Sequence, residues 1–340
     1  MAVAFVLGGT GQIGRAVARR LAEAGWDVTA ASRGLRPVDA EVRHVRLDRT
    51  QAGSLAAALG DGVDVLVDVI AFGREDAEQL NALAGRIGST IAVSSASVYA
   101  DGRGRTLDEA TDEASFPDLP VPIPETQATV PPGDATYSTR KAAMEQALLE
   151  GPLPATILRP CAVHGPGSEL PRELYFVKRA LDGRRAILLG SSGESRFHTT
   201  SVANVAELVL LAAERPASRV LNAGDPDPPS VREIGRAVGA ALEHAWVEVL
   251  DPRTGYELPE LRNPWAVPRP LLVDMSEAER LGYRPVTAYP EAVRETCAWL
   301  LEQLDGRDWR EIFPESADYL GRYFDYGAED AYLSQLAGAD

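Results

Sequence analysis

Residues 3–14 read VAFVLGGTGQIG, an apolar run that passes directly into a glycine-rich segment and then into a helical pattern. Glycines in this setting allow a tight turn, close approach of the backbone to a pyrophosphate, and close packing of helix on strand. The helix N-terminus favours the negative charge of the phosphates. The segment therefore predicts a strand, a dinucleotide-binding loop and a helix, with a purely structural turn as the alternative. The residues expected at the cofactor are Gly8, Gly11, Gln12, Ile13 and Gly14.

Short apolar runs alternate with helical patterns over residues 1–160, which is typical of a parallel sheet covered by helices. Candidate strands are Val3–Leu7, Val28–Ser32, Val42–Leu47, Val63–Val69, Thr90–Ser94 and Ala155–Leu158. Candidate helices are Ile13–Ala24, Ser54–Leu59, Arg74–Ile87 and Tyr137–Leu149. We expect an α/β fold with a doubly wound parallel sheet, the Rossmann fold, and a dinucleotide-binding domain over residues 1–160. Its ligand crevice should lie at the carboxyl ends of the strands.

The alternation loosens beyond residue 160, and we expect residues 161–305 to form a smaller substrate-binding lobe, partly woven back onto the sheet. Helical patterns in this part are Glu169–Leu181, Val202–Ala213, Ser230–Ala241 and Glu291–Leu304. Six prolines between Phe116 and Pro132 predict an irregular loop over the strand ends. Residues 306–340 form an acidic tail with seven aromatic side chains. A docked C-terminal helix is the favoured interpretation, and a subunit contact or a lid over the site is the alternative.

The charge of the 340-residue chain is strongly negative, −16 in formal terms, but it is unevenly placed. Residues 101–134 carry −6 and residues 306–340 carry −5, whereas residues 1–50 carry +3. An anionic ligand is therefore least repelled near the glycine-rich segment. The acid excess argues against nucleic-acid binding, including by an RNA-binding relative of this fold, because phosphate affinity rests on clustered lysine and arginine.

Cysteine spacing and hydropathy set further limits. Cys161 and Cys297 are far apart and lack metal-ligand spacing, so we expect neither a disulfide framework nor a metal site, and we expect a cytoplasmic protein. The first apolar run lacks the flanks of a signal peptide. No apolar run approaches the roughly 18 residues of a membrane span, so no membrane contact is expected.

The end of the second strand distinguishes between the two nicotinamide dinucleotides. An NAD site usually offers an acid to the ribose 2′-hydroxyl there. Here the strand ends in Ser32 and Arg33, with Arg36 close behind. Guanidinium groups suit a 2′-phosphate, which favours NADP(H), with NAD(H) as the alternative cofactor and a plain surface arginine as the structural alternative. Asp48, just after the third strand, is expected to bind the adenine amino group or to be a turn residue.

Two side chains four residues apart, Tyr137 and Lys141, share one face of a predicted helix. The ammonium should favour the phenolate and lower the tyrosine pKa from about 10 toward working pH. Tyr137 is therefore a candidate general acid and base. A serine cluster at residues 94–97 follows the fifth strand and faces the same crevice, where a hydroxyl can bind a substrate oxygen. An exposed helix pair and a helix cap are the structural alternatives.

In this order and at these distances, the motifs resemble the extended short-chain dehydrogenase/reductase family, often labelled NAD-dependent epimerase/dehydratase. LRPCAVHGPG at residues 158–167, VANVA at 202–206 and LNAG at 221–224 extend the resemblance over about residues 1–305. It implies Ser95, Tyr137 and Lys141 as catalytic residues, with Lys141 also holding the nicotinamide ribose. Hydride would pass between nicotinamide C4 and a carbinol or carbonyl carbon. The resemblance further implies cofactor contacts at Ala71 and Pro160, and substrate contacts at Ser97, His164 and Arg196.

Departures from the family pattern narrow the expected reaction. Family 4,6-dehydratases carry an Asp-Glu pair after the catalytic Ser or Thr, whereas this chain has Ala96-Ser97, which disfavours dehydration. Ala162 stands where nucleotide-sugar members place an Asn that touches the substrate diphosphate, which weakens the case for such a substrate. His164 stands where the family has Tyr. For both His164 and His198 we expect a packing or loop role rather than a catalytic one.

We therefore expect a reductase or epimerase that transfers hydride at a secondary alcohol or ketone of a sugar-like or polyhydroxylated small molecule. A non-catalytic NADP-binding sensor with the same fold is the alternative. We also expect a homodimer. The small residues proposed for its contact, on the helix that follows Tyr137, are Ala142, Ala143, Ala147 and Leu148.

Overall fold

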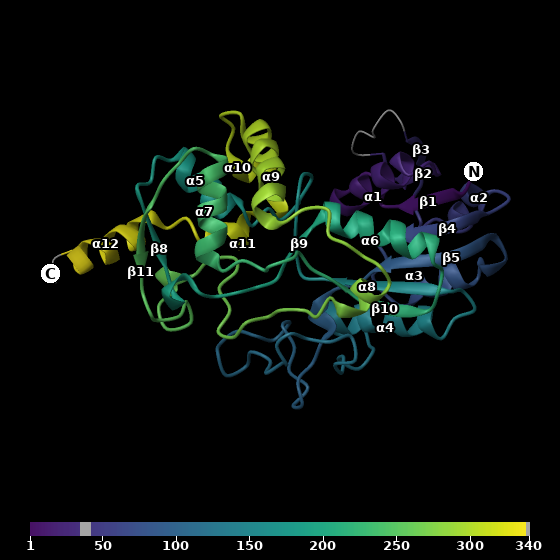
Figure 1. Cartoon of the computed structure of the whole chain (residues 1–340), viewed down its shortest axis with the longest axis horizontal. Helices are drawn as coiled ribbons and strands as arrows, with labels where there is room; N and C mark the ends of the chain where they lie inside the picture. The colour runs from purple at the N-terminus through teal and green to yellow at the C-terminus, as the bar shows by residue number, and fades with distance from the viewer. Residues whose placement is uncertain (35–41, 338–340) are drawn as a thin grey trace.

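The computed structural model describes residues 1–34 and 42–337. A parallel sheet covered by helices forms one end of the molecule, and a smaller, mainly helical lobe forms the other, with the last helix at its far side (Figure 1). Arg36, expected at the cofactor, lies outside the described residues.

The main sheet has seven strands, and the expected doubly wound fold is confirmed. Its spatial order is β10, β6, β5, β4, β1, β2, β3, and every pairing is parallel. The order reverses between β1 and β4, which places the ligand crevice at the carboxyl ends of these two strands. The strands are β1 Val3–Leu7, β2 Asp27–Ser32, β3 Arg43–Arg46, β4 Val63–Asp68, β5 Ile87–Val93, β6 Ala155–Pro160 and β10 Arg219–Ala223.

Helices bury both faces of this sheet, which is why its central strands are continuous apolar runs. On one face, α1 (Gln12–Glu23) packs against α6 (Val202–Glu214). On the other lie α2 (Ser54–Leu59), α3 (Arg74–Asn81) and α4 (Tyr137–Leu149), with α3 packed on α4.

The predicted dimer contact through α4 is wrong for the residues that were named. Ala142, Ala143, Ala147 and Leu148 are at most 7% exposed within the chain itself. The helix lies against α3 and the sheet, so its small residues serve close packing inside the subunit.

Two predicted helices are shorter in the structure. The segment Arg74–Ile87 contains α3 only to Asn81, then a 3₁₀ turn at Ala84–Arg86, and β5 already begins at Ile87. Gly88 permits that early start, because a Cβ there would lie 2.6 Å from the Asp64 carbonyl oxygen. In the segment Glu169–Leu181, α5 begins only at Leu174, after a proline that disfavours helix in the residue before it.

The lobe is built from helices and two short strand pairs. Its main helices are α5 (Leu174–Leu181), α7 (Val231–Ala241) and α9 (Tyr289–Leu304), with the short α8 (Ser276–Arg280) beside β10. Strands β7 (Ala162–His164) and β9 (Thr199–Ser201) pair in parallel, as do β8 (Ala186–Leu189) and β11 (Val247–Leu250). Large buried side chains, among them Phe176, Trp265 and Tyr289, fill the core.

The aromatic tail docks onto this lobe, as the favoured interpretation predicts. It forms α10 (Trp309–Ile312), α11 (Ala317–Gly321) and α12 (Tyr326–Ala337). Trp309, Phe313 and Leu320 are at most 5% exposed and belong to the lobe core. A buried ion pair between Arg179 of α5 and Glu329, at 2.9 Å, fastens α12.

The proline-rich segment is the expected irregular loop, and one buried asparagine fixes its position. The Asn222 side chain, at the end of β10, donates to the carbonyls of Ile123 (2.9 Å) and Asp274 (3.0 Å). Its amide oxygen accepts a hydrogen bond of 2.6 Å from the Tyr99 hydroxyl. The last sheet strand therefore holds three separate segments together.

Among the described residues, no helix is long and apolar enough to cross a membrane. In the same part of the chain, no group of His, Cys, Asp and Glu side chains is arranged to hold a metal ion. Both cysteines are free thiols.

Candidate active site

The catalytic candidates on α4 are placed by the start of that helix. Thr136 is its N-cap: the hydroxyl accepts from the Thr139 amide (3.3 Å), and the Thr136 amide donates to the Thr139 hydroxyl (2.8 Å). Tyr137 is consequently the first helical residue, at the crevice. One turn on, Lys141 donates from Nζ to the carbonyl oxygens of Ala71 (2.6 Å) and Val93 (2.9 Å). These carbonyls follow β4 and end β5, so the sheet edge itself fixes the ammonium.

Lys141 is only 6% exposed, and its environment changes its proton affinity. Burial lowers the pKa of Lys141 to about 8, because the charged form loses hydration, while the carboxylates of Asp68 and Glu145 oppose that shift. At neutral pH the side chain is therefore still mostly an ammonium, which donates hydrogen bonds to the two carbonyl oxygens.

Ser95 lies near Tyr137 at the end of β5. Ser95 caps the 3₁₀ turn Ala96–Val98, where its Oγ accepts from the Ser97 amide at 3.1 Å, and it is near enough to Tyr137 to affect the pKa of the phenol. Although 46% of Tyr137 is exposed, desolvation of the phenol raises its pKa, Ser95 opposes the rise, and Asp108 adds to it. The structure thus brings Ser95, Tyr137 and Lys141 together at the carboxyl ends of β4 and β5.

The expectation that Lys141 lowers the pKa of Tyr137 is wrong in this structure. Lys141 Nζ lies 5.8 Å from the Tyr137 ring centroid and is turned to the two carbonyls, so desolvation prevails. Tyr137 is a protonated phenol at neutral pH. This is the form that can donate a proton to a carbonyl oxygen.

Phe72 is a site residue that the sequence motifs do not reveal. Its ring lies 5.6 Å from that of Tyr137, and the Arg140 guanidinium covers it at 4.5 Å. The sequence could have indicated Phe72 only by its position directly after β4, because this fold has its ligand crevice at the carboxyl ends of the strands. Phe72 forms an apolar wall beside the phenol.

The glycine-rich loop has the geometry that a dinucleotide requires. Gly8 has φ +79°, and a Cβ on Gly14 would lie 2.2 Å from the Gly8 carbonyl oxygen, so the loop and α1 can approach only without side chains. The N-cap of α1 is Gly11, which offers no side-chain cap to the first amides. Those amides suit the phosphates of an NAD(P) molecule. The Gln12 side chain instead donates to the Gly165 carbonyl at 3.1 Å.

The residues expected to contact the ribose and adenine of the cofactor lie at the ends of β2 and β3, a place that we call the nucleotide corner. Ser32 Oγ lies 2.9 Å from His44 Nε2 and accepts from the Gly34 amide at 3.1 Å. Hydrogen bonds from Thr50 lower the pKa of Asp48, and the nearby charge of Arg33 adds to the shift. Arg33 and Asp48 therefore share one corner.

Of the remaining cofactor candidates, Ile13 is partly buried in the first turn of α1. Ala71 lies after β4 and Pro160 ends β6, both at the crevice edge. The position of these side chains agrees with the crevice that the strand order predicts. Their contact with a cofactor stays a prediction.

Two of the predicted substrate contacts are engaged within the chain. Ser97 Oγ lies 3.0 Å from Ser138 Oγ, which also donates to Asp108 at 2.9 Å, so this cluster joins the loop to α4. Arg196 donates to the Pro228 carbonyl at 2.5 Å and lies 3.3 Å from Glu233, with a third of its side chain exposed. Substrate contact by either residue stays a prediction.

His164 is not a substrate contact, because it is 2% exposed. Its Nε2 lies 2.7 Å from Asp225, and its ring lies 4.9 Å from that of Tyr289. Burial alone would lower the pKa of His164, but the Asp225 carboxylate raises it above its usual value. His198, 3% exposed, lies 2.8 Å from the Asp225 carbonyl and has the packing role expected of it.

The sequence model of the NAD dependent epimerase/dehydratase family matches residues 4–224, and the chain belongs to this family. It is an NAD(P)-dependent enzyme of the short-chain dehydrogenase/reductase type, as the resemblance implies. A curated relative is 2′-dehydrokanamycin reductase of Streptomyces kanamyceticus, 29% identical over 252 residues. That alignment covers 70% of this chain and 66% of the reductase, just under two thirds of its length.

Solved structures share the fold across both lobes. UDP-N-acetylglucosamine 4-epimerase of Methanobrevibacter ruminantium M1 superposes with a TM-score of 0.67 at 20% identity, covering 89% of this chain and 99% of the epimerase. UDP-glucuronic acid 4-epimerase of Bacillus cereus, solved with UDP-glucuronic acid and NAD, gives 0.66 at 16% identity, with 88% and 99% covered. At these identities the likeness shows the fold alone.

Proposed function

We propose that this protein is an NADPH-dependent reductase of a ketone in a sugar-like or polyhydroxylated small molecule. The observation that carries the proposal is the nearness of Ser95, after β5, and Tyr137, at the start of α4, to the buried ammonium that Lys141 presents to the Ala71 and Val93 carbonyls. Tyr137 keeps its proton at neutral pH, so it can act as the general acid toward a carbonyl oxygen, as carbonyl reduction requires. The similarity to 2′-dehydrokanamycin reductase, whose name describes such a reduction, supports the same direction.

Ser95, Tyr137 and Lys141 would each have a different role in the reduction of the carbonyl group. The nicotinamide, when bound, supplies the hydride to the carbonyl carbon. Tyr137 donates its proton to the carbonyl oxygen as negative charge develops there, and the Ser95 hydroxyl orients that oxygen. The ammonium of Lys141 lies one helical turn from Tyr137 and would hold the nicotinamide ribose. Because Ala71 and Val93 carbonyls fix Lys141, this charge needs no rearrangement during the step.

The preference for NADPH rests on charge at the nucleotide corner. Arg33 is exposed at the end of β2, where an NAD site would usually present an acid. A guanidinium at this position suits a 2′-phosphate, which supports NADPH as the cofactor. The charge of Arg33 acts on Asp48, whose Oδ1 accepts hydrogen bonds from the Thr50 amide and hydroxyl in a turn.

An epimerase would use the same Ser95, Tyr137 and Lys141 and is the second candidate. It differs in retaining its cofactor and regenerating it within each turnover. Net loss of nicotinamide absorbance with a ketone substrate therefore supports the reductase, whereas product formation without that loss supports the epimerase. Ala162 disfavours a nucleotide-sugar substrate in either case.

Replacing Tyr137 with Phe is the direct test. The first ketones to assay are polyhydroxylated and aminated sugars, beginning with 2′-dehydrokanamycin. We expect Tyr137→Phe to lower turnover by about 10²–10⁴-fold while NADPH affinity stays within about twofold, because only the proton donor is lost. Near-normal turnover in Tyr137→Phe would refute the assigned role. Cofactor binding without turnover on any ketone or alcohol, together with a co-purifying protein, would instead favour the sensor.

A further inference from the structure

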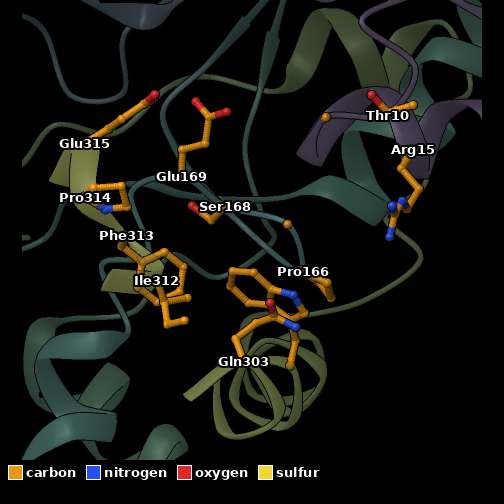
Figure 2. A pocket seen from close by; sticks show the side chains of 13 residues that line it. Thr10, Arg15, Pro166, Ser168, Glu169, Gln303, Ile312, Phe313, Pro314 and Glu315 are labelled. Carbon is orange, nitrogen blue, oxygen red and sulfur yellow. The ribbon is translucent and has the colours of Figure 1, made fainter. Parts of the chain in front are cut away.

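A pocket of about 460 Å³ lies between the glycine-rich loop and the aromatic tail. Thr10, Gly11 and Arg15 line one side. Figure 2 shows Ile312 and Phe313 facing them from the opposite side. None of the residues that line the pocket is Ser95, Tyr137 or Lys141. The pocket is therefore outside the proton-transfer site but directly beside the loop that suits the cofactor phosphates.

The rim between these two sides is closely fitted to the glycine-rich loop. Residues 165–169 cross from β7 toward α5, and a Cβ on Gly167 would lie 3.4 Å from Gln12 Cα. Gln12 also donates to the Gly165 carbonyl. The rim is thus in direct contact with the glycine-rich loop and joins it to the lobe.

The opposite wall is closely packed, although it belongs to the C-terminal part of the chain. Phe313 is 5% exposed, and its ring lies 5.8 Å from that of Trp299 on α9. Ser316, 3% exposed, donates its hydroxyl to the Glu169 carbonyl on the rim. Gln303, one turn beyond Trp299, completes this wall (Figure 2). These residues lie beyond residue 224, where the family match ends.

We propose that this wall, formed by Trp299, Gln303, Ile312 and Phe313, closes the outer side of the dinucleotide site at its pyrophosphate and slows cofactor release. The inference rests on the proposed function, since it takes NADPH as the ligand. The uncapped amides of α1 attract the phosphates, and Arg15 extends toward the same space (Figure 2). Three of the four wall side chains, Trp299, Ile312 and Phe313, are apolar, whereas Glu169 and Glu315 line another part of the pocket. Apolar side chains opposite the α1 amides and Arg15 lower the local dielectric and so strengthen their attraction for the phosphates.

Release kinetics provide a readout that does not depend on turnover. Ile312→Ala and Gln303→Ala shorten partly exposed wall residues, so the fold should tolerate them. We expect each to raise the NADPH dissociation rate by about fivefold, measured by stopped-flow displacement with nicotinamide fluorescence, and to change the association rate little. Gln303→Trp fills the pocket and should weaken equilibrium binding in calorimetry. Leu301→Ala is the matched control, because Leu301 is 40% exposed on the same helix and does not line the pocket.

The outcomes separate this inference from the proposed function. Faster release in the two alanine variants, with Leu301→Ala unchanged, supports the wall. Wild-type release and affinity in all three pocket variants would overturn the wall while leaving the reductase proposal intact. Failure of the unaltered chain to bind NADPH or NADH would overturn both.

Discussion

A buried ion pair between helix α4 and the sheet allows a quantitative test of the packing argument. Glu145 of α4 and Arg159 of β6 are each 4% exposed and are joined by two hydrogen bonds of 3.0 and 2.5 Å. The guanidinium also covers the Tyr99 ring at 4.8 Å. Glu145 is on the same helix face as Tyr137 and Lys141, so this pair anchors that helix to the sheet.

Removing one partner should be far more damaging than removing both. Glu145→Leu leaves a buried guanidinium without its counter-charge, which typically costs about 3–5 kcal/mol. At about 1.4 kcal/mol per factor of ten, this lowers the folding equilibrium constant by a factor of at least about 100. In Glu145→Leu with Arg159→Met the unpaired charge is gone, and replacement of a buried pair by apolar groups of similar volume is often near neutral. We expect the double variant to recover most of the lost stability.

Urea unfolding followed by circular dichroism measures both effects. Glu150→Ala at the exposed end of the same helix is the control, because Glu150 only accepts from Gln146 at 3.0 Å and should change stability by less than about 0.5 kcal/mol. A double variant as unstable as Glu145→Leu alone would refute the reasoning. It would mean that lost packing, rather than an uncompensated charge, dominates.

Three further predictions concern the site. Because burial lowers the pKa of Lys141 to about 8, its ammonium is lost as pH rises through that value. Ketone reduction should then fall about tenfold per pH unit above it, and a pH–rate profile that stays flat to about pH 10 would contradict this. Arg33→Ala should weaken NADPH binding by about tenfold in calorimetry and leave NADH within about twofold, whereas equal losses would exclude a 2′-phosphate contact. Gly14→Ala should abolish cofactor binding, because its Cβ would lie 2.2 Å from the Gly8 carbonyl oxygen, while Gly85→Ala, with no heavy atom within 4 Å, should bind normally.

The sheet domain was predictable because its elements carry their own pattern. Strand β1 and helices α2 and α4 have the bounds that the sequence indicates, since apolar periodicity and a Thr136 cap are local properties. The end of α3 and the early start of β5 could not be predicted. The need for a glycine at position 88 depends on the Asp64 carbonyl of the neighbouring strand, which only the folded structure brings close. The pairing of β8 with β11 likewise joins segments about sixty residues apart.

The site was predictable in its residues more than in its electrostatics. Ser95, Tyr137 and Lys141 come together because strand ends and a helix start meet at one edge of the sheet, and their catalytic roles stay predictions. The sequence could not show that Lys141 donates to two carbonyls. With Lys141 engaged there, desolvation is the main influence on the pKa of Tyr137 and raises it. His164 was misassigned for a similar reason, because its partner Asp225 lies 61 residues further along the chain.

The position of Asn222 has a consequence for synthesis on the ribosome. Tyr99 precedes Asn222 by 123 residues, and Ile123 precedes it by 99. At about 5–20 residues per second, Tyr99 waits about 6–25 s before its partner is made. Six of the seven sheet strands exist by then, while the loop over the crevice still lacks its attachment. A nascent chain can therefore complete its glycine-rich loop long before β10, so this part of the cofactor site exists well before Asn222 fixes the proline-rich loop.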